Sequence, residues 1–211
     1  MSAILLLLLT AFAQQPDPAL RHPDSAAMHA RAPAVFRVHV DTSKGAIEIE
    51  VHRDWAPRGA DRFYDLVRHG YYDGVRFFRI RAGAFVQFGI SGDPSVASLW
   101  RGQTILDDPP HGIPNRRGTI AFAFKDPNGR TSQVFINLKD NSGAYDKEPF
   151  VPFGRIVEGM DVADALYAGY GERAGGGIRA GHQDPVFAGG NAYLKKQFPK
   201  LDYIIRARVE R

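Results

Sequence analysis

Residues 71–94 read YYDGVRFFRIRAGAFVQFGISGDP, and this stretch decides the fold class. It contains two short runs rich in apolar residues, Val75–Ile80 and Phe85–Gly89, which lie between Gly, Asp and other turn-forming residues. Runs of this length between turn residues are typical of β-strands, because helices need longer periodic segments. We therefore predict two short strands here.

Similar runs lie on both sides of this stretch. Upstream, residues 36–40 and 46–51 alternate apolar with polar side chains, and Ser43–Gly45 between them suits a hairpin turn. Many short strands with few helices favour a closed β-barrel. The predicted fold is mainly β, a closed antiparallel eight-stranded β-barrel capped by two helices. Its remaining strands are expected at Thr119–Phe124, Gln133–Asn137, Pro152–Val157 and Leu201–Val209.

Two segments carry helix signals. Pro57 suits the first turn of a helix, Asp54 is a suitable cap before it, and apolar residues follow at helical spacing until Gly70. We expect this helix to close one end of the barrel. A second helix is expected across Met160–Ala168, and the Gly-rich stretch Gly169–Gly190 after it is expected to be a long surface loop.

The first 34 residues differ in composition from the rest of the chain. Residues 1–13 hold an apolar run that ends in Ala11-Phe12-Ala13, a pattern typical of a signal peptide and its cleavage site. This run is shorter than the roughly 20 apolar residues of a transmembrane span. Residues 14–34 contain four prolines and no apolar periodicity, which is typical of a flexible linker.

These observations predict an exported protein, periplasmic or secreted, with no stable membrane insertion after the signal is cleaved. A buried N-terminal segment is the alternative interpretation of residues 1–13. The folded domain is expected to span residues 35–211, with a C-terminal extension from about residue 169. We see no internal repeat and no second domain.

The charges of the chain exclude some classes of function. The 27 basic and 23 acidic residues give a net charge of +4, and the surplus lies in residues 171–211. Because the charges elsewhere are balanced, no nucleic-acid binding is expected. Cysteine is absent, which excludes disulfides, and the seven histidines show no metal-ligand spacing. We expect a monomer without metal or cofactor.

Residues 71–94 also resemble the signature region of the cyclophilins, in which G-Y-Y-D/N-G-x-x-F-H/F-R leads into P-G-F-x-x-Q-x-G. Other segments resemble later parts of the family pattern in the same order, namely residues 117–123, 126–137 and 152–160. The resemblance covers roughly residues 36–168. It implies a cyclophilin-like barrel and peptidyl-prolyl cis-trans isomerase activity on proline-containing segments of exported proteins.

The resemblance places Arg79 at the position of the family's catalytic arginine. An X-Pro bond rotates slowly because amide resonance imposes a barrier of about 18–20 kcal/mol. In the twisted amide the prolyl nitrogen regains its lone pair, so a fixed cationic donor favours the transition state. Without the resemblance, Arg79 is more simply explained as a solvated strand charge, like Arg76 and Arg81.

The resemblance also assigns substrate-binding positions. Phe85 and Gln87 are two residues apart on an expected strand and so face the same side. Phe135 matches the proline-pocket phenylalanine, and Gln87 the glutamine that orients substrate and arginine. The remaining positions are Ala123 and Phe124, whose main chain is expected to pair with the peptide, and Tyr145 and Phe150, which lie near pocket-lining positions.

The chain departs from the family pattern at three places. Ala82-Gly83-Ala84 lacks the usual proline and the phenylalanine of P-G-F, and Phe78 replaces a frequent histidine. These departures keep a second interpretation open, a cyclophilin-fold peptide-binding chaperone with weak or no isomerase activity. The joint presence of Arg79, Gln87 and Phe135 favours the enzyme.

Overall fold

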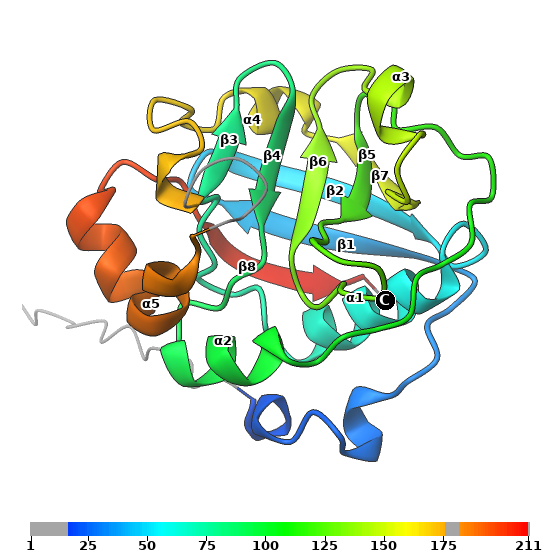
Figure 1. Ribbon diagram of the computed structural model, residues 1–211, viewed down its shortest axis with the longest axis horizontal. Helices are drawn as coiled ribbons and strands as arrows, with labels where there is room; N and C mark the ends of the chain where they lie inside the picture. Colours follow the sequence, from blue (N-terminus) through cyan, green and yellow to red (C-terminus); the bar gives the residue numbers. More distant parts are fainter. Residues whose placement is uncertain (1–16, 176–181, 211) are drawn as a thin grey trace, which may run out of the picture.

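Eight antiparallel strands form the sheet of this protein (Figure 1). The computed structural model describes residues 17–175 and 182–210. Within them, the order of strands across the sheet is β3-β4-β6-β5-β7-β2-β1-β8. The prediction of a mainly β fold with eight antiparallel strands is confirmed. The strands are β1 Val35–Thr42, β2 Gly45–His52, β3 Arg79–Arg81, β4 Phe85–Phe88, β5 Thr119–Phe122, β6 Val134–Asn137, β7 Pro152–Glu158 and β8 Ile204–Val209.

Backbone hydrogen bonds bring the two edges of the sheet together. The Gly74 N–H donates to the carbonyl of Ile204 (2.8 Å), and the Ile204 N–H donates to the carbonyl of Val75 (2.8 Å). The Phe77 N–H donates to the carbonyl of Asp202 (3.0 Å). The sheet therefore curls into a barrel that closes just before β3 and β8, and the described parts of β3 and β8 are not themselves paired.

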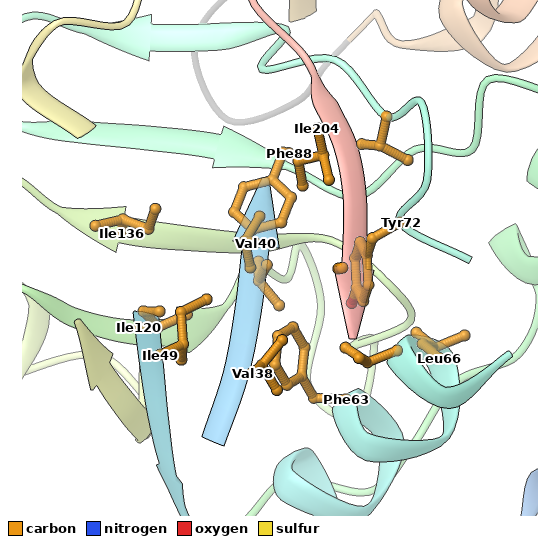
Figure 2. Packing of buried hydrophobic residues seen from close by; sticks show 14 of the residues in the cluster. Val38, Val40, Ile49, Phe63, Leu66, Tyr72, Phe88, Ile120, Ile136 and Ile204 are labelled. Atoms are coloured by element: carbon orange, nitrogen blue, oxygen red, sulfur yellow. The ribbon is translucent and has the colours of Figure 1, made fainter. Parts of the chain in front are cut away.

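The barrel core follows from the alternation along the strands. On β1, Val38 and Val40 are buried while His39 between them is more exposed, and β2 repeats the pattern. The hairpin turn expected at Ser43–Gly45 is confirmed, since the Thr42 hydroxyl donates to the Gly45 carbonyl (2.7 Å). Figure 2 shows side chains of the core from the sheet and its neighbours, with Val38, Val40, Ile49, Phe63, Leu66, Tyr72, Phe88, Ile120, Ile136 and Ile204 labelled.

Helix α1, Pro57–Arg68, is the first expected helix. The predicted cap, Asp54, is wrong. The N-cap residue is Ala56, and no side chain of the local sequence caps the helix. The carboxylate of Asp108 accepts instead from the backbone N–H groups of Arg58 (2.9 Å) and Gly59 (2.8 Å). A carboxylate from a distant loop thus satisfies the free amides of the first turn, which favour negative charge.

More helices are present than the two that the sequence predicts. The second expected helix is α4, Met160–Asp164, and the others are α2 Pro94–Arg101, α3 Ser142–Tyr145 and α5 Asp184–Gln197. The surface loop predicted for Gly169–Gly190 is therefore wrong in its last part, where α5 begins. The described residues also form three 3-10 helices: η1 Pro18–Arg21, η2 Ala26–Met28 and η3 Arg173–Gly175.

The C-terminal extension builds a second, smaller core beside the barrel. Helix α5 packs against α2 at the side of the sheet that carries β3 (Figure 1). Val186 and Leu194 of α5 are buried there together with Phe78 and Ile90, which flank β3 and β4. The extension is thus joined to the strands that carry Arg79 and Gln87.

The flexible linker predicted for residues 14–34 does not hold for its described part, residues 17–34. Leu20 and Met28 are 1% and 3% exposed and belong to the main core. The indole N–H of Trp100 donates to the Leu20 carbonyl (2.8 Å), and the segment runs beneath α2 and α1 in Figure 1. The expected signal peptide, residues 1–13, lies outside the described residues. Among those that are described, no helix is long and apolar enough to cross a membrane.

Candidate active site

A pocket of about 680 Å³ opens beside β3, β4 and β6. Its lining includes every residue that the sequence predicts for the site: Arg79, Phe85, Gln87, Ala123, Phe124, Phe135, Tyr145 and Phe150. Five charged residues complete the lining, namely Arg81, Lys125, Asp126, Glu148 and Glu172. The structure therefore brings together residues that are up to 93 positions apart in the sequence.

The strand register explains why these side chains meet. Arg79 on β3 lies opposite Gln87 on β4, and Gln87 lies opposite Phe135 on β6. Neighbouring residues on these strands point to the other face, so Val86 and Ile136 are buried in the barrel core. One row across three strands thus presents a guanidinium, an amide and an aromatic ring to the pocket.

The Arg79 guanidinium has defined partners on three sides. Its Nη1 donates to Oε1 of Gln87 (2.8 Å), and its Nη2 donates to Oε1 of Glu172 (2.5 Å). The ring centroid of Phe85 lies 4.8 Å from its central carbon, within the range of a cation–π contact. Arg79 is therefore a fixed donor rather than a solvated strand charge.

A chain of amide side chains continues from Gln87. Its Nε2 donates to Oε1 of Gln133 (2.9 Å), and Gln133 exchanges hydrogen bonds with Gln183, just before α5 (2.9 and 3.1 Å). Gln87 and Gln183 are both buried. Because each amide is oriented by the next, Gln87 can turn only its oxygen toward Arg79.

Aromatic rings form the apolar wall of the pocket. The Phe135 ring centroid lies 5.3 Å from that of Phe150 and 5.7 Å from that of Tyr145. Phe124 packs on Phe150, with centroids 4.6 Å apart. Burial raises the pKa of the Tyr145 hydroxyl above its ordinary value, so it remains neutral. These rings enclose an apolar space beside the Arg79 donor.

A buried arginine supports this wall from behind. The Arg130 guanidinium lies 4.7 Å from the centroid of the Phe124 ring and donates to the carbonyl of Pro149, next to Phe150. It also forms an ion pair with Asp107. Arg130 thus contacts the Phe124 ring and the backbone next to Phe150, two neighbouring rings of the aromatic wall.

None of the three departures from the family pattern, Phe78, Ala82 and Ala84, is among the residues that line the pocket. Phe78 is 1% exposed and packs in the second core, so its replacement of a histidine does not alter the pocket rim. Ala84 is buried beneath the pocket, and its carbonyl accepts from Leu138 N–H (2.9 Å) and from the Asn141 amide (2.9 Å). Neither residue lines the pocket.

Among the polar residues that the sequence did not predict for the site, two are hydrogen-bonded to Arg79 or Gln87, namely Glu172 and Gln133. Gln133 lies two positions before Phe135, and the alternation of a strand would have placed both on one face. Glu172 lies in the Gly-rich stretch after α4, where no motif or periodicity marks a site residue. Only the folded structure shows its contact with Arg79.

One group of described residues has the composition of a metal site. His39, Glu48 and Glu210 each offer a ligand atom, and these atoms lie within 4.8 Å of one another. None of the three lines the pocket. The His39 ring is already hydrogen-bonded to Glu48 and to Asp41, its Nε2 lying 3.0 Å from the Asp41 carboxylate. The contacts of His39 are a cross-strand pair with Glu48 of β2 and a same-strand pair with Asp41 of β1.

Comparison with known proteins identifies the family. The family model described as cyclophilin type peptidyl-prolyl cis-trans isomerase matches residues 36–178. The chain is 34% identical to the peptidyl-prolyl cis-trans isomerase cyp18 of Streptomyces antibioticus over 154 residues, which is 70% of this chain and 89% of the relative. It is 33% identical to peptidyl-prolyl cis-trans isomerase B of Escherichia coli over 132 residues, 59% of this chain and 80% of the relative.

Solved structures show the same fold. A cyclophilin type peptidyl-prolyl cis-trans isomerase of Cryptosporidium parvum matches with a TM-score of 0.59 at 16% identity, covering 84% of this chain and 98% of the other. The family model and the identity to the curated relatives show that the chain belongs to the cyclophilin family. It is a peptidyl-prolyl cis-trans isomerase.

Proposed function

We propose that this isomerase acts on proline-containing segments of exported proteins, with Arg79 as the catalytic residue and with no metal or cofactor. The observation that carries the proposal is the placement of the Arg79 guanidinium at the edge of an aromatic pocket. A crystal structure of the Cryptosporidium parvum relative was determined in the presence of the dipeptide Ala-Pro. That result supports proline peptides as ligands of this pocket.

The geometry suits an electrostatic mechanism. The rings of Phe135 and Phe150 offer an apolar space for the proline ring, while Arg79 supplies N–H donors beside it. As the amide twists, the prolyl nitrogen becomes a hydrogen-bond acceptor, and a donor that is already in place stabilises this state without reorganising. Rotation needs no covalent step, so no acid, base or nucleophile is required.

Of the main-chain groups of Ala123 and Phe124 that are expected to pair with a peptide, one is already used by the protein itself. The Ala123 N–H donates to the Gln133 carbonyl (2.9 Å) and is thus used within the sheet. A bound peptide would therefore pair with the carbonyl of Ala123 or with the main chain of Phe124. Such pairing fixes an extended peptide whatever its side chains are.

Export is the second part of the proposal. It is supported by the apolar run and the small-x-small pattern in residues 1–13. Proline isomerisation takes roughly 10–100 s without catalysis and limits the folding of many chains. An isomerase in the periplasm or outside the cell would act on clients that fold after export.

One preparation tests both parts. The full chain is expressed in a bacterial host, recovered from the periplasm or the medium, and its N-terminus is sequenced. The cis-to-trans rate of an X-Pro test peptide is then compared for this protein and for Arg79→Ala at equal concentration of folded protein. We expect cleavage after Ala13 and loss of most of the acceleration in the variant, roughly 100-fold or more for removal of a preorganised donor.

The other outcomes are equally informative. Retention of the uncleaved chain in the cytoplasm would contradict export. Equal rates for the two proteins would contradict the role of Arg79. If neither accelerates the reaction but both bind proline peptides, the chain is a peptide-binding chaperone of cyclophilin fold.

A further inference from the structure

The Arg79 guanidinium is held by a carboxylate that lies outside the sequence motifs of the site. Its Nη2 donates to Oε1 of Glu172 (2.5 Å), while Nη1 donates to Oε1 of Gln87 (2.8 Å). One face of the group rests on the Phe85 ring. Two acceptors on different nitrogens and one ring together determine both the position and the plane of the guanidinium.

The backbone around Glu172 is anchored to the strand that carries Arg79. The Ile80 N–H, next to Arg79, donates to the carbonyl of Gly171, next to Glu172 (3.0 Å). Gly175 approaches so closely that a Cβ there would lie 2.9 Å from the Cβ of Arg79. The carboxylate therefore comes from a segment packed against β3, and its contact with Arg79 is not that of a freely moving surface side chain.

Burial strengthens the electrostatic attraction between Arg79 and Glu172, because little water screens the two charges. The side chains of Arg79 and Glu172 are 12% and 22% exposed. A guanidinium with so little water around it needs a counter-charge, and removing one partner of a buried pair leaves the other uncompensated. The Nε of Arg79 is buried without a hydrogen-bond partner, so the two terminal nitrogens provide all of its contacts with acceptors among the described residues.

We propose that Glu172 is a positioning residue, which holds the Arg79 guanidinium in the orientation that meets the prolyl nitrogen. The inference rests on the catalytic role proposed for Arg79, and Glu172 acts through that residue. The opposite hypothesis is that the carboxylate competes with the peptide for Arg79. The two hypotheses predict opposite changes in kcat/KM when Glu172 is removed. Removal of a competitor would raise kcat/KM, whereas removal of a positioning residue would lower it.

The first test compares Glu172→Ala with Glu172→Gln, which keeps an acceptor oxygen in place. The measurements are kcat/KM for an X-Pro test peptide and the Kd of that peptide from an NMR titration. We expect Glu172→Ala to lower kcat/KM about tenfold, since misplacing a catalytic group is costly, with little change in Kd. Glu172→Gln, which restores the acceptor but not the charge, should regain part of this loss. An unchanged or raised kcat/KM in Glu172→Ala would overturn the proposal, as would a loss explained by Kd alone.

The second test observes Arg79 directly. Its guanidinium N–H resonances are assigned by their disappearance in Arg79→Lys and followed in both Glu172 variants without peptide. We expect slow exchange with solvent in the wild type and in Glu172→Gln, and fast exchange in Glu172→Ala. Unaltered exchange in Glu172→Ala would show that Gln87 alone holds the group, and the proposal would fail.

A matched control separates positioning from the loss of an ion pair as such. Glu50 also pairs with arginines, Arg37 and Arg155, but it lies on β2 outside the pocket. Glu50→Gln should leave kcat/KM and the Arg79 resonances unchanged. The resonance test does not depend on activity. An inactive wild type with a slowly exchanging Arg79 would contradict the proposed function and still support the contact with Glu172.

Discussion

Arg79, Gln87 and Phe135 face one another across three neighbouring strands, and their chemistry depends on that register. The alternate residues, such as Val86 and Ile136, fill the barrel core. A shift of one residue in the register of β3 or β4 would exchange the two faces of that strand. The Arg79 guanidinium of β3 or the Gln87 amide of β4 would then point into the core. The apolar residues behind the site therefore specify which polar side chains reach the peptide.

At this scale we predict that Phe135→Ala weakens peptide binding. Phe135 is 5% exposed and touches Tyr145 and Phe150, so its removal takes away the central ring of the apolar wall. Burial of a phenylalanine side chain contributes about 1.5–3 kcal/mol. Even part of this contact with a proline ring corresponds to roughly a tenfold change in affinity. An NMR titration with an X-Pro peptide should show the Kd rising by about that factor.

A buried phenylalanine away from the pocket provides the control for this prediction. Phe36 on β1 is 6% exposed and packs on Tyr64. Phe36→Ala should lower the free energy of unfolding by about 3–5 kcal/mol, as expected for a core truncation, and leave the Kd of the folded fraction unchanged. Equal Kd values for Phe135→Ala and the wild type would exclude Phe135 from the binding wall.

At the scale of secondary structure, strands and site residues could be predicted where the alternation of side chains and the family motifs coincide. Elsewhere tertiary contacts decide the structure. Helix α5 was not predicted because Gly189 and Gly190 interrupt its pattern, and Gly190 adopts a left-handed φ of 50° at a kink. The contact of Glu172 was missed for a related reason, since it depends on how a Gly-rich segment packs on β3.

Glu50 on strand β2 is a carboxylate whose protonation should change the free energy of unfolding. Glu50 accepts hydrogen bonds from His52 (3.0 Å), Arg155 (3.1 Å) and Arg37 (3.2 Å). These bonds, that of His52 foremost, lower its pKa from 4.5 to about 2 against the opposing effect of burial. Because the folded-state pKa is the lower one, the contribution to stability is complete above the unfolded pKa and is lost as the pH falls toward 2.

The corresponding prediction compares unfolding in urea at several pH values. Glu50→Gln should be less stable than the wild type near neutral pH, and the difference should shrink as the pH falls from about 4.5 to about 2. Glu158→Gln, on the neighbouring strand β7 and exposed, controls for the loss of a charge. A difference between Glu50→Gln and the wild type that stays constant over this range would refute the assignment.

At the scale of the whole molecule, the structure differs most from the prediction in the N-terminal segment, residues 17–34. Four prolines and the lack of periodicity hide the fact that single apolar residues, Leu20 and Met28, insert into the core. Short 3-10 turns carry them, and such turns leave no amphipathic pattern. The hydrogen bond from Trp100 to the Leu20 carbonyl joins the segment to α2.

This packing leads to the last prediction. Leu20 is 1% exposed, whereas Leu106, on the loop after α2, is 59% exposed. If residues 17–34 are part of the fold, Leu20→Ala should lower the free energy of unfolding by about 2–5 kcal/mol, and Leu106→Ala should change it by less than about 0.5 kcal/mol. Urea unfolding of the chain from residue 14 onward measures both. Equal effects of the two substitutions would restore the linker interpretation. A large effect confined to Leu20 would mean that residues 17–34 stabilise the barrel from the side of α1 and α2.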